Sequence, residues 1–400
     1  MTIENYFITK FGPKQVSKEF SQNSVKFIHA SDIHLGAAQY RNEYRAGDFI
    51  QAFQEILELA ITHHVDFIIL GGDVFTSLEI LPGKLTRIVN ILRDFKDFTQ
   101  NSILIIAIEG NHDIRKFSRG VRFEKRGQSW LKLLNSLGLI ILLDADLDAD
   151  YEEIFKPYNF AIKIGGKIQI KDVVVYGSRY LGERPISSLP KIRRAIDNDR
   201  GLFNVLLQHF GIEGQMDNVP GIKLEEIQLL KHRIDYLALG HYHKQFILGD
   251  WIFNPGSSEA VSSIDSSFRR GVFLVEILKK DEKYVKKVKA IRLINRKYMW
   301  KTLYLSYEIR NKKDFEFILI KKLKSLLRNL DDKIDPTDPR MPILNLRLKG
   351  TKPSCKINEK DLRKKICDIF PIVDVRVHQK FRISLKTLDK YMLNYKLSKN

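Results

Sequence analysis

Residues that could bind a metal ion or move a proton gather at five points of this sequence, each directly after an apolar run. They are, in order, Asp32 and His34, Asp73, Asn111 and His112, His209, and His241 and His243. The third point is the densest, because "ILIIAI" ends in "EGNHD", with Asn, His and Asp side by side. Five of the ten histidines of the chain lie at these points, so the histidines are not scattered at random.

Carboxylates and imidazoles brought to one place can bind divalent metal ions. Oxygen and nitrogen ligands without a thiolate suit manganese, iron or zinc better than calcium. The candidate ligands exceed the number that one tetrahedral ion takes, and two ions about 3.5–4 Å apart that share a carboxylate fit them better. The candidates are Asp32, His34, Asp73, Asn111, His209, His241 and His243.

The spacing within "DIH" and "HYH" has a simple geometric meaning. Alternate residues of an extended segment point to the same side, so both donors of each pair can reach one cluster. Each motif alone is a weak signal, because "GGD" after a strand is commonly a turn and a loop histidine is commonly solvated. The other five histidines, His29, His63, His64, His232 and His378, are interpreted as such solvated side chains. The ordered set as a whole favours a metal site.

The elements that must position these residues follow an α/β pattern. Short apolar runs at 25–30, 65–72 and 103–108 alternate with segments at 49–64 and 81–95 that have apolar residues at helical spacing. Further apolar runs end near 177, 211, 243 and 278. Short, fully apolar strands indicate sheets covered on both faces, and functional residues collect beyond the carboxyl ends of such strands.

The charge of the chain is concentrated in its last part. Residues 1–278 hold 33 Lys and Arg against 34 Asp and Glu, whereas residues 279–400 hold 34 against 14. The second part therefore carries a net charge of +20, and it reads as a small separate α+β domain with helices expected at 315–330 and 359–370. A basic region attached to a neutral one indicates a polyanionic partner, nucleic acid or an anionic membrane. A Lys-rich surface that serves solubility is the plainer alternative.

The remaining composition excludes several classes of protein. The two cysteines, Cys355 and Cys367, are too few for a disulfide scaffold or a cysteine metal site. No signal peptide and no apolar stretch of the roughly 20 residues that span a bilayer is found. We expect a cytoplasmic or nucleoid-associated protein that is not secreted and has no membrane partner.

The ordered set "DIH … GGD … GNHD … QH … GHYH" resembles the calcineurin-like metallophosphoesterases over residues 25–278. Within them "ILIIAIEGNHDIR", "IDYLALGHYHKQF" and "FNPGSSEA" are similar to the SbcD/meiotic-recombination-eleven nucleases. The resemblance implies an α/β fold with a β-sandwich core flanked by helices and a smaller α+β capping domain. It divides the chain into an N-terminal extension (1–24), a nuclease domain (25–285), a basic DNA-binding cap (286–385) and a C-terminal tail (386–400).

The resemblance also implies roles for individual residues. One metal ion would be held by Asp32, His34, Asp73 and His243, and the other by Asp73, Asn111, His209 and His241, with Asp73 bridging. His112 would face the scissile phosphate without binding metal, as the catalytic imidazole, and Asp113 would orient it. The implied cofactors are two divalent ions per subunit, Mn²⁺ first. The implied partners are DNA ends, hairpins and single strands, an SbcC-type SMC-like ATPase, and a second copy of the chain in a homodimer.

The chain departs from the family pattern at two places. After "GGDVF" the nucleases often carry a histidine that contacts the DNA backbone, whereas this chain has Thr76, so that role is not carried over. The helices that dock the ATPase usually follow the cap, whereas about fifteen residues remain here. Tyr391, Met392, Leu393 and Tyr395 form one apolar helix face or part of a frayed tail.

The leading hypothesis is a two-metal DNA endo/exonuclease of double-strand-break processing and repair. A small-molecule or cyclic-nucleotide phosphodiesterase on the same core is a second hypothesis, although a small substrate has no use for the basic region. A DNA-binding scaffold subunit with weak catalysis is a third, and the complete set of candidate ligands argues against it.

Overall fold

The computed structural model describes residues 6–12, 24–114, 129–182, 185–196, 201–281, 283–305, 309–331 and 333–382. The chain divides into two compact units. The first comprises residues 1–39 and 45–294, and the second comprises residues 40–44 and 295–400. The predicted tail at 386–400 and most of the predicted extension at 1–24 lie outside the described residues. None of the helices in the described ranges has the length and apolar character that a membrane span requires.

The first unit contains two six-stranded sheets. One has the strand order β12-β11-β1-β2-β3-β4 and the other β5-β6-β7-β8-β10-β9. The strands of the first sheet are β1 (Ser24–Ala30), β2 (Phe67–Leu70), β3 (Leu104–Ala107), β4 (Ile141–Leu142), β11 (Val272–Lys280) and β12 (Lys283–Ile291). Those of the second are β5 (Lys167–Ile170), β6 (Val173–Gly177), β7 (Phe203–His209), β8 (Tyr236–Gly240), β9 (Phe246–Leu248) and β10 (Ile252–Asn254).

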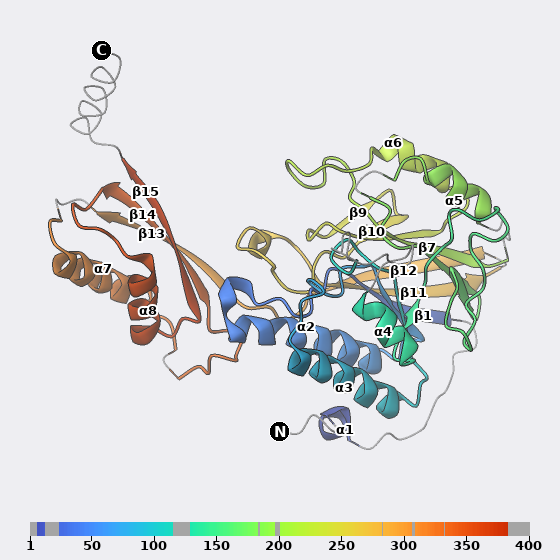
Figure 1. Ribbon diagram of the computed structural model, residues 1–400, viewed down its shortest axis with the longest axis horizontal. Coiled ribbons are helices and arrows are strands. Elements are labelled where there is room, and N and C mark those ends of the chain that lie inside the picture. Colours follow the sequence, from blue (N-terminus) through green and yellow to red (C-terminus); the bar gives the residue numbers. More distant parts are fainter. Residues whose placement is uncertain are drawn as a thin grey trace, which may run out of the picture. The chain divides into compact units, whose positions relative to one another are not determined.

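Helices cover the outer faces of both sheets (Figure 1). The long helices α2 (Glu43–Thr62) and α3 (Pro82–Thr99), together with α4 (Trp130–Ser136), pack on the first sheet. The short helices α5 (Leu189–Ala195) and α6 (Leu224–Ile227) and the 3₁₀ turn η2 (Gln228–Leu230) pack on the second. The helix α1 (Tyr6–Phe11) buries Phe7 against Phe95 of α3, and two further 3₁₀ turns are η1 (Gln39–Arg41) and η3 (Asp265–Ser267).

The two sheets face each other across an apolar layer. Phe27 of β1 packs edge-on against Tyr236 of β8 with ring centroids 5.4 Å apart, and Phe273 of β11 packs edge-on against Phe253 of β10 at 5.9 Å. Every residue of β2, β6, β7 and β8 is buried. β2, β6 and β8 therefore appear in the sequence as apolar runs, whereas β7 also buries the polar side chains of Asn204 and Gln208. The predicted fold class, a β-sandwich core flanked by helices, is confirmed.

The strands that lead to the candidate residues are parallel. β1 pairs in parallel with β2 and β2 with β3, and in the second sheet β7 pairs in parallel with β8. The carboxyl ends of these strands therefore lie at one edge of each sheet. In the first sheet, β11 and β12 form an antiparallel hairpin on the side of β1 opposite β2, and β12 is the outermost strand. The strand β12 spans the predicted domain boundary at residue 285 and is part of the first unit.

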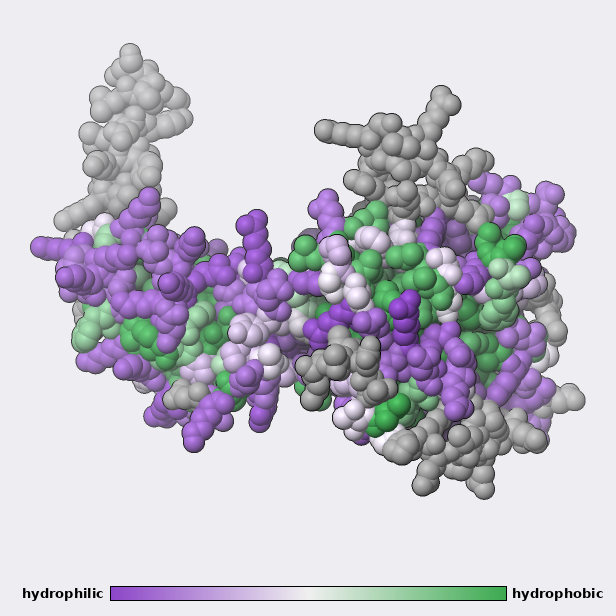
Figure 2. Space-filling view, turned by 60° about the horizontal axis from the view of Figure 1, so that its bottom comes forward, coloured by the Kyte–Doolittle hydropathy of each residue, from purple (hydrophilic) through white to green (hydrophobic). Residues whose placement is uncertain are grey.

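The second unit is a β-α-β-α-β arrangement. Its elements are β13 (Tyr298–Leu305), α7 (Lys312–Leu326), β14 (Ile343–Thr351), α8 (Glu359–Ile369) and β15 (Asp374–Arg382). The strands form a parallel sheet with β14 in the centre, and both helices share one apolar core with it. Figure 2 shows a largely hydrophilic surface on this unit. The sequence predicts a small α+β domain, and the structure builds it from parallel strands joined by helices.

His29 differs from its interpretation as a solvated side chain. It lies in β1 and is fully buried, with Nδ1 3.0 Å from the hydroxyl oxygen of Tyr236 and Nε2 3.1 Å from the carbonyl oxygen of Leu239. Burial lowers the pKa of His29 to about 3, against the backbone hydrogen bond to Leu239, which raises it. A neutral imidazole fits this place because it joins the two sheets through one donor and one acceptor.

We expect His29 to make the fold sensitive to acid. Its pKa in the folded state is below the unfolded value near 6.5, so its contribution to stability is full above that pH and is lost as the pH falls toward 3. Between pH 7 and pH 5 the free energy of unfolding should fall by about 2 kcal/mol more in the wild type than in His29→Gln. Urea unfolding of metal-free protein measures this difference. The variant His232→Gln, which removes an exposed histidine, is the control, and equal pH dependence of wild type and His29→Gln would contradict the expectation.

Candidate metal centre

The predicted residues are brought together at the carboxyl ends of strands from both sheets. Asp32 and His34 follow β1, Asp73 follows β2, and Asn111 and His112 follow β3. His209 is the last residue of β7, and His241 and His243 follow β8. Residues separated by more than 200 positions therefore meet in one place. Two groups of side chains can be distinguished there.

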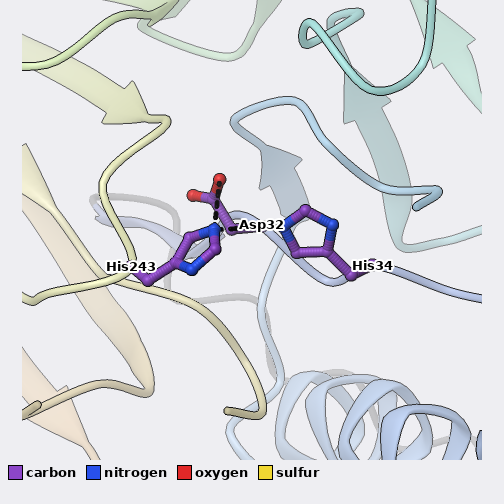
Figure 3. Close-up of side chains that lie close together, drawn as sticks. All are labelled: Asp32, His34 and His243. Carbon is purple, nitrogen blue, oxygen red and sulfur yellow. Dashed lines mark hydrogen bonds and ion pairs between the residues drawn. The ribbon is translucent and has the colours of Figure 1, made fainter. Parts of the chain in front are cut away.

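The first group consists of Asp32, His34 and His243, whose ligand atoms all lie within 4.8 Å of one another. Figure 3 shows the three side chains close together, Asp32 and His34 from the loop after β1 and His243 from the loop after β8. His34 Nε2 lies 3.1 Å from His243 Nε2, and His243 Nε2 lies 4.0 Å from Asp32 Oδ1. Asp32 and His34 are buried. Two imidazole nitrogens and a carboxylate oxygen thus converge on one point.

The second group consists of Asp73, His209 and His241, with the amide oxygen of Asn111 between the two rings. His209 Nε2 lies 3.3 Å from Asp73 Oδ2. Asn111 Oδ1 lies 3.2 Å from His209 Nε2 and 3.0 Å from His241 Nδ1. The predicted seven ligands are therefore divided between two neighbouring groups.

The backbone adopts left-handed conformations at four of these residues. The φ angle is +51° at Asp32, +52° at His34, +49° at Asp73 and +93° at His241. A non-glycine residue in this region costs on the order of 1 kcal/mol or more, and such residues concentrate at functional sites. The loops are held by backbone hydrogen bonds, because Asp32 N–H donates to Gly72 O at 3.1 Å and His34 N–H to Asp73 O at 3.0 Å. The strain is therefore imposed by the surrounding fold.

Glycines are required where these loops approach one another. A Cβ atom on Gly110 would lie 2.2 Å from Asp73 Oδ1 and 2.3 Å from the Asp73 nitrogen. A Cβ atom on Gly72, whose φ is +90°, would lie 2.6 Å from His209 Nδ1. The glycines of "GGD" and "GNHD" thus allow the Asp73 carboxylate to sit against the next loop.

Acceptors behind the imidazoles fix the direction in which each ring faces. His209 Nδ1 lies 2.7 Å from the carbonyl oxygen of Gly71, and His243 Nδ1 lies 2.9 Å from Asp265 Oδ2. With Nδ1–H donating to these oxygens, the Nε2 lone pair faces the site, which is the arrangement of metal-bound histidines. His34 Nδ1 is buried and has no hydrogen-bond partner among the described residues.

Burial and close contact shift the pKa values of these groups in opposite directions. Burial alone would lower the pKa of His209, but the Asp73 carboxylate raises it to about 9. Burial would raise the pKa of Asp73, yet His209 and His34 hold it well below its usual range. Burial and the neighbouring His243 lower the pKa of His34 to about 3, and burial and His209 lower that of His241 to about 4.

These shifts fit a site made for cations. Burial raises the pKa of Asp32, and the charge of Asp73 raises it further against the histidines nearby. His34 and His241 stay neutral at neutral pH and keep lone pairs. The buried Nδ1 of His34 has no hydrogen-bond partner among the described residues, and the carboxylates of Asp32 and Asp73 are both buried in the same cluster. The donor set fits divalent metal ions of the Mn²⁺, Fe²⁺ or Zn²⁺ kind.

His112 lies beside the two groups and is exposed. Its backbone N–H donates to Asp73 Oδ1 at 2.7 Å, and its ring Nδ1 lies 2.9 Å from the carbonyl oxygen of Thr76. Its ring centroid is 5.1 Å from that of His34. The imidazole is therefore fixed at one nitrogen and presents the other to solvent next to the candidate ligands.

Asp113 is placed differently from its predicted role of orienting the His112 ring. Its buried carboxylate accepts N–H groups of Val74 at 3.2 Å, Phe75 at 2.8 Å and Gly110 at 2.9 Å. Burial raises the pKa of Asp113 well above its usual value, and the charge of Asp73 adds to this. Asp113 thus fastens the loop after β2 to the loop after β3. The Thr76 carbonyl contacts the His112 ring instead, so a main-chain atom does what the sequence assigns to a carboxylate.

Two contributors were not found in the sequence. Asp265 supports His243 and also accepts the N–H groups of Val261 at 3.2 Å and Ser262 at 3.1 Å through the same oxygen. Tyr180 places its ring centroid 5.9 Å from that of His209 and 6.0 Å from that of His241. Asp265 lies in the serine-rich "SSIDSS", which has no periodicity, and Tyr180 follows β6 without a polar cluster. No sequence signal separates them from ordinary loop residues.

Residues 25–245 match the family described as "Calcineurin-like phosphoesterase", more than half of the chain. The chain belongs to the calcineurin-like phosphoesterase family. Its relatives include the "DNA double-strand break repair protein Mre11" of Archaeoglobus fulgidus, 30% identical over 239 residues, 59% of this chain and 50% of the relative. The protein of the same name in Saccharolobus solfataricus is 28% identical over 263 residues, 64% of this chain and 61% of the relative.

A third relative of that name, from Sulfolobus acidocaldarius, is 23% identical over 333 residues, 82% of this chain and 76% of the relative. This family member therefore has Mre11-type homologues over much of its length, and the predicted resemblance is confirmed. The chain spans about half the length of the Archaeoglobus relative and about three fifths of the Saccharolobus one.

The contact between Asp265 and His243 yields a specific expectation. Asp265→Asn keeps the shape of the side chain but removes the charge that favours the Nδ1–H form of His243, and one Mn²⁺ ion should bind about 10- to 100-fold more weakly. Binding at the Asp73 group should change little. Calorimetric titration of EDTA-treated protein with Mn²⁺ measures both.

The control is Asp235→Asn, since Asp235 accepts the N–H of Asn204 at 2.8 Å at the opposite end of β8. Urea unfolding of both variants checks that the fold is kept. Unchanged Mn²⁺ binding in Asp265→Asn, or an equal loss in both groups, would show that Asp265 does not act through His243.

Proposed function

We propose that this phosphoesterase is a two-metal DNA endonuclease and exonuclease. The observation that carries the proposal is the pair of adjacent ligand groups with the exposed imidazole of His112 beside them. Asp32, His34, Asp73 and His243 would hold one ion, and Asp73, Asn111, His209 and His241 the other. When bound, such ions neutralise phosphoryl charge and lower the pKa of water, which hydrolysis of an anionic diester requires.

The residues of the chain supply position and proton transfer. The contacts of Nδ1 with Gly71 O and Asp265 orient the rings of His209 and His243, so their Nε2 atoms would be available to hold the ions. The Thr76 carbonyl accepts Nδ1–H of His112. When the ring is protonated, the Nε2–H of His112 can donate to the phosphoryl oxygen or to the leaving sugar oxygen. The side chain at position 76 is a threonine, which brings no charge to the DNA backbone.

A macromolecular polyanion is the substrate that best fits the charge of the chain. The part from residue 279 onward carries 34 Lys and Arg against 14 Asp and Glu, and such excess charge binds phosphate backbones with little sequence preference. The relatives carry the name of a DNA double-strand break repair protein. We assign residues 25–285 to hydrolysis and 286–385 to a DNA-binding cap.

The biological setting is the processing of DNA double-strand ends and hairpins in repair, in the cytoplasm or at the nucleoid. We propose an SbcC-type SMC-like ATPase and a second copy of the chain as partners. The segment 386–400, for which an apolar helix face and a frayed tail are the two alternatives, lies outside the described residues. A small-molecule phosphodiesterase on the same core is the second candidate, because the ligand groups by themselves do not select a large substrate.

We expect EDTA-treated protein to be inactive and added Mn²⁺ to restore nicking of supercoiled plasmid and shortening of labelled duplex ends. Ions bound at the two groups are required to neutralise the phosphate and to supply the nucleophile. A bis-nitrophenyl phosphate assay run beside it separates the two candidates. Hydrolysis of the small ester without cleavage of any DNA would refute the nuclease and favour the small-molecule enzyme.

The variant His112→Ala should lower kcat for DNA cleavage by about 10²- to 10⁴-fold, because one proton donor is removed. Mn²⁺ and DNA affinity should stay within about threefold of the wild type, since His112 is not assigned as a ligand. His232→Ala, at an exposed position, is the control. A matching loss of Mn²⁺ binding would mean that His112 acts as a ligand.

A further inference from the structure

The three-stranded sheet of the second unit has one face that its helices do not cover. Leu303, Leu305, Leu346, Leu348 and Val375 pack into the core with α7 and α8. Because side chains alternate along a strand, the residues between them face the opposite side. The pairing register arranges them in three rows: Trp300, Asn345 and Arg376; Thr302, Arg347 and His378; Tyr304, Lys349 and Lys380.

This open face combines aromatic rings with positive charge. Trp300 is 47% exposed and Tyr304 is 61% exposed. The Trp300 and His378 rings stack with centroids 5.5 Å apart at 20°, and the Arg347 guanidinium lies 5.8 Å from the Trp300 centroid. Lys349 Nζ lies 5.9 Å from the Tyr304 centroid. None of the nine residues carries a carboxylate.

Asn345, in the middle strand, has an unsatisfied donor. The residue is fully buried, and its Oδ1 lies 3.2 Å from His378 Nε2. Its Nδ2 has no hydrogen-bond partner among the described residues. A buried amide N–H without an acceptor is costly and rare. An acceptor supplied from outside the chain would satisfy it.

One corner of the face is already occupied. The Arg376 guanidinium lies 4.4 Å over the ring of Tyr40, and Asn42 Nδ2 donates to Val373 O at 3.0 Å, both within the second unit. Trp300 and Tyr304, on β13 at the other side of the sheet, keep exposed rings. Burial lowers the pKa of His378, and the positive charges of Arg347, Arg376 and Lys380 lower it further. The ring is therefore neutral at neutral pH, in a positive surrounding.

We propose that this face binds single-stranded DNA, with bases stacked on Trp300 and Tyr304 and phosphates held by Arg347, Lys349 and Lys380. Exposed rings offer a stacking surface only to bases that are not paired within a duplex, and cations beside them follow the backbone. The two rings are four residues apart on β13, about 13 Å, so they contact different bases. The choice of DNA as the nucleic acid rests on the proposed function; the stacking surface itself does not.

The test is the affinity of the full chain for fluorescein-labelled (dT)15, measured by anisotropy in EDTA. Trp300→Ala and Tyr304→Ala should each weaken binding roughly 5- to 100-fold, as expected when a stacking residue is removed. Trp300→Phe should keep most of the affinity. Affinity for a blunt duplex should change less than about twofold in all three, since its bases are not accessible.

The salt dependence of binding separates charge from stacking. The double variant Arg347→Gln, Lys349→Gln should reduce the slope of log affinity against log salt by about 1.4, which is about 0.7 for each phosphate that the variant no longer neutralises. Phe317→Ala is the matched control, because Phe317 is 69% exposed on α7, away from this sheet face. Hydrolysis of bis-nitrophenyl phosphate with Mn²⁺ should be unchanged in every one of these variants.

Wild-type affinity for (dT)15 in a Trp300→Ala, Tyr304→Ala double variant would overturn the proposal. Equal losses on single strand and duplex, or an equal loss in Phe317→Ala, would do the same. A tenfold preference for (rU)15 over (dT)15 would overturn the assignment to DNA. Because binding is measured without metal, failure of the nuclease assay leaves this result intact, and failure here leaves the nuclease assay intact.

Discussion

The buried carboxylate of Asp73 is the group on which the arrangement of the site depends. It accepts a hydrogen bond from the backbone N–H of His112 and contacts His209 Nε2 from the second sheet. The carbonyl oxygen of Asp73 accepts the backbone N–H of His34. Loops after β1, β2 and β3 and the end of β7 thus meet at one residue. A negative charge at this depth is tolerated only when charge of opposite sign lies beside it. His209 supplies part of that charge, and a divalent ion would supply more.

The backbone strain and the buried charge of the site cost free energy, which the packing of the surrounding sheets and helices offsets. Four candidate ligands have left-handed backbone conformations, and two carboxylates are buried within one cluster. Such features persist where the fold over-determines them. Here the parallel strands β1, β2 and β3 and the apolar layer between the sheets fix where each loop begins. Glycines at 72 and 110 then allow the loops to approach closely.

The fold and the main residues of the site could be predicted from the sequence because two simple rules apply. Buried parallel strands read as continuous apolar runs, and their carboxyl ends collect functional side chains. Asp32, Asp73 and His209 each follow or end such a run, so their meeting could be expected. The spacing "HYH" likewise places His241 and His243 at the same edge.

The residues that could not be predicted act through contacts distant in the sequence. Asp113 stands next to His112 in the chain, yet its carboxylate turns to the backbone of Val74 and Phe75, a loop about forty residues earlier. His29 resembles a solvated histidine by type, and only the second sheet, through Tyr236 and Leu239, makes it a buried one. Asp265 lies in a loop without periodicity. Local pattern carries no information about partners that the tertiary fold supplies.

The second unit illustrates the same limit for surfaces. In the sequence, "YMWKTLYL" contains mainly apolar and aromatic residues with one lysine, and what is predicted for the region is a small basic α+β domain. Once α7 and α8 are seen to cover the face of Leu303 and Leu305, the alternate residues Trp300 and Tyr304 must lie on the opposite face. The pairing register then places Arg347 and Lys349 beside them. Net charge alone favours any polyanion, whereas rings and cations in register on one open face favour unpaired bases over a duplex.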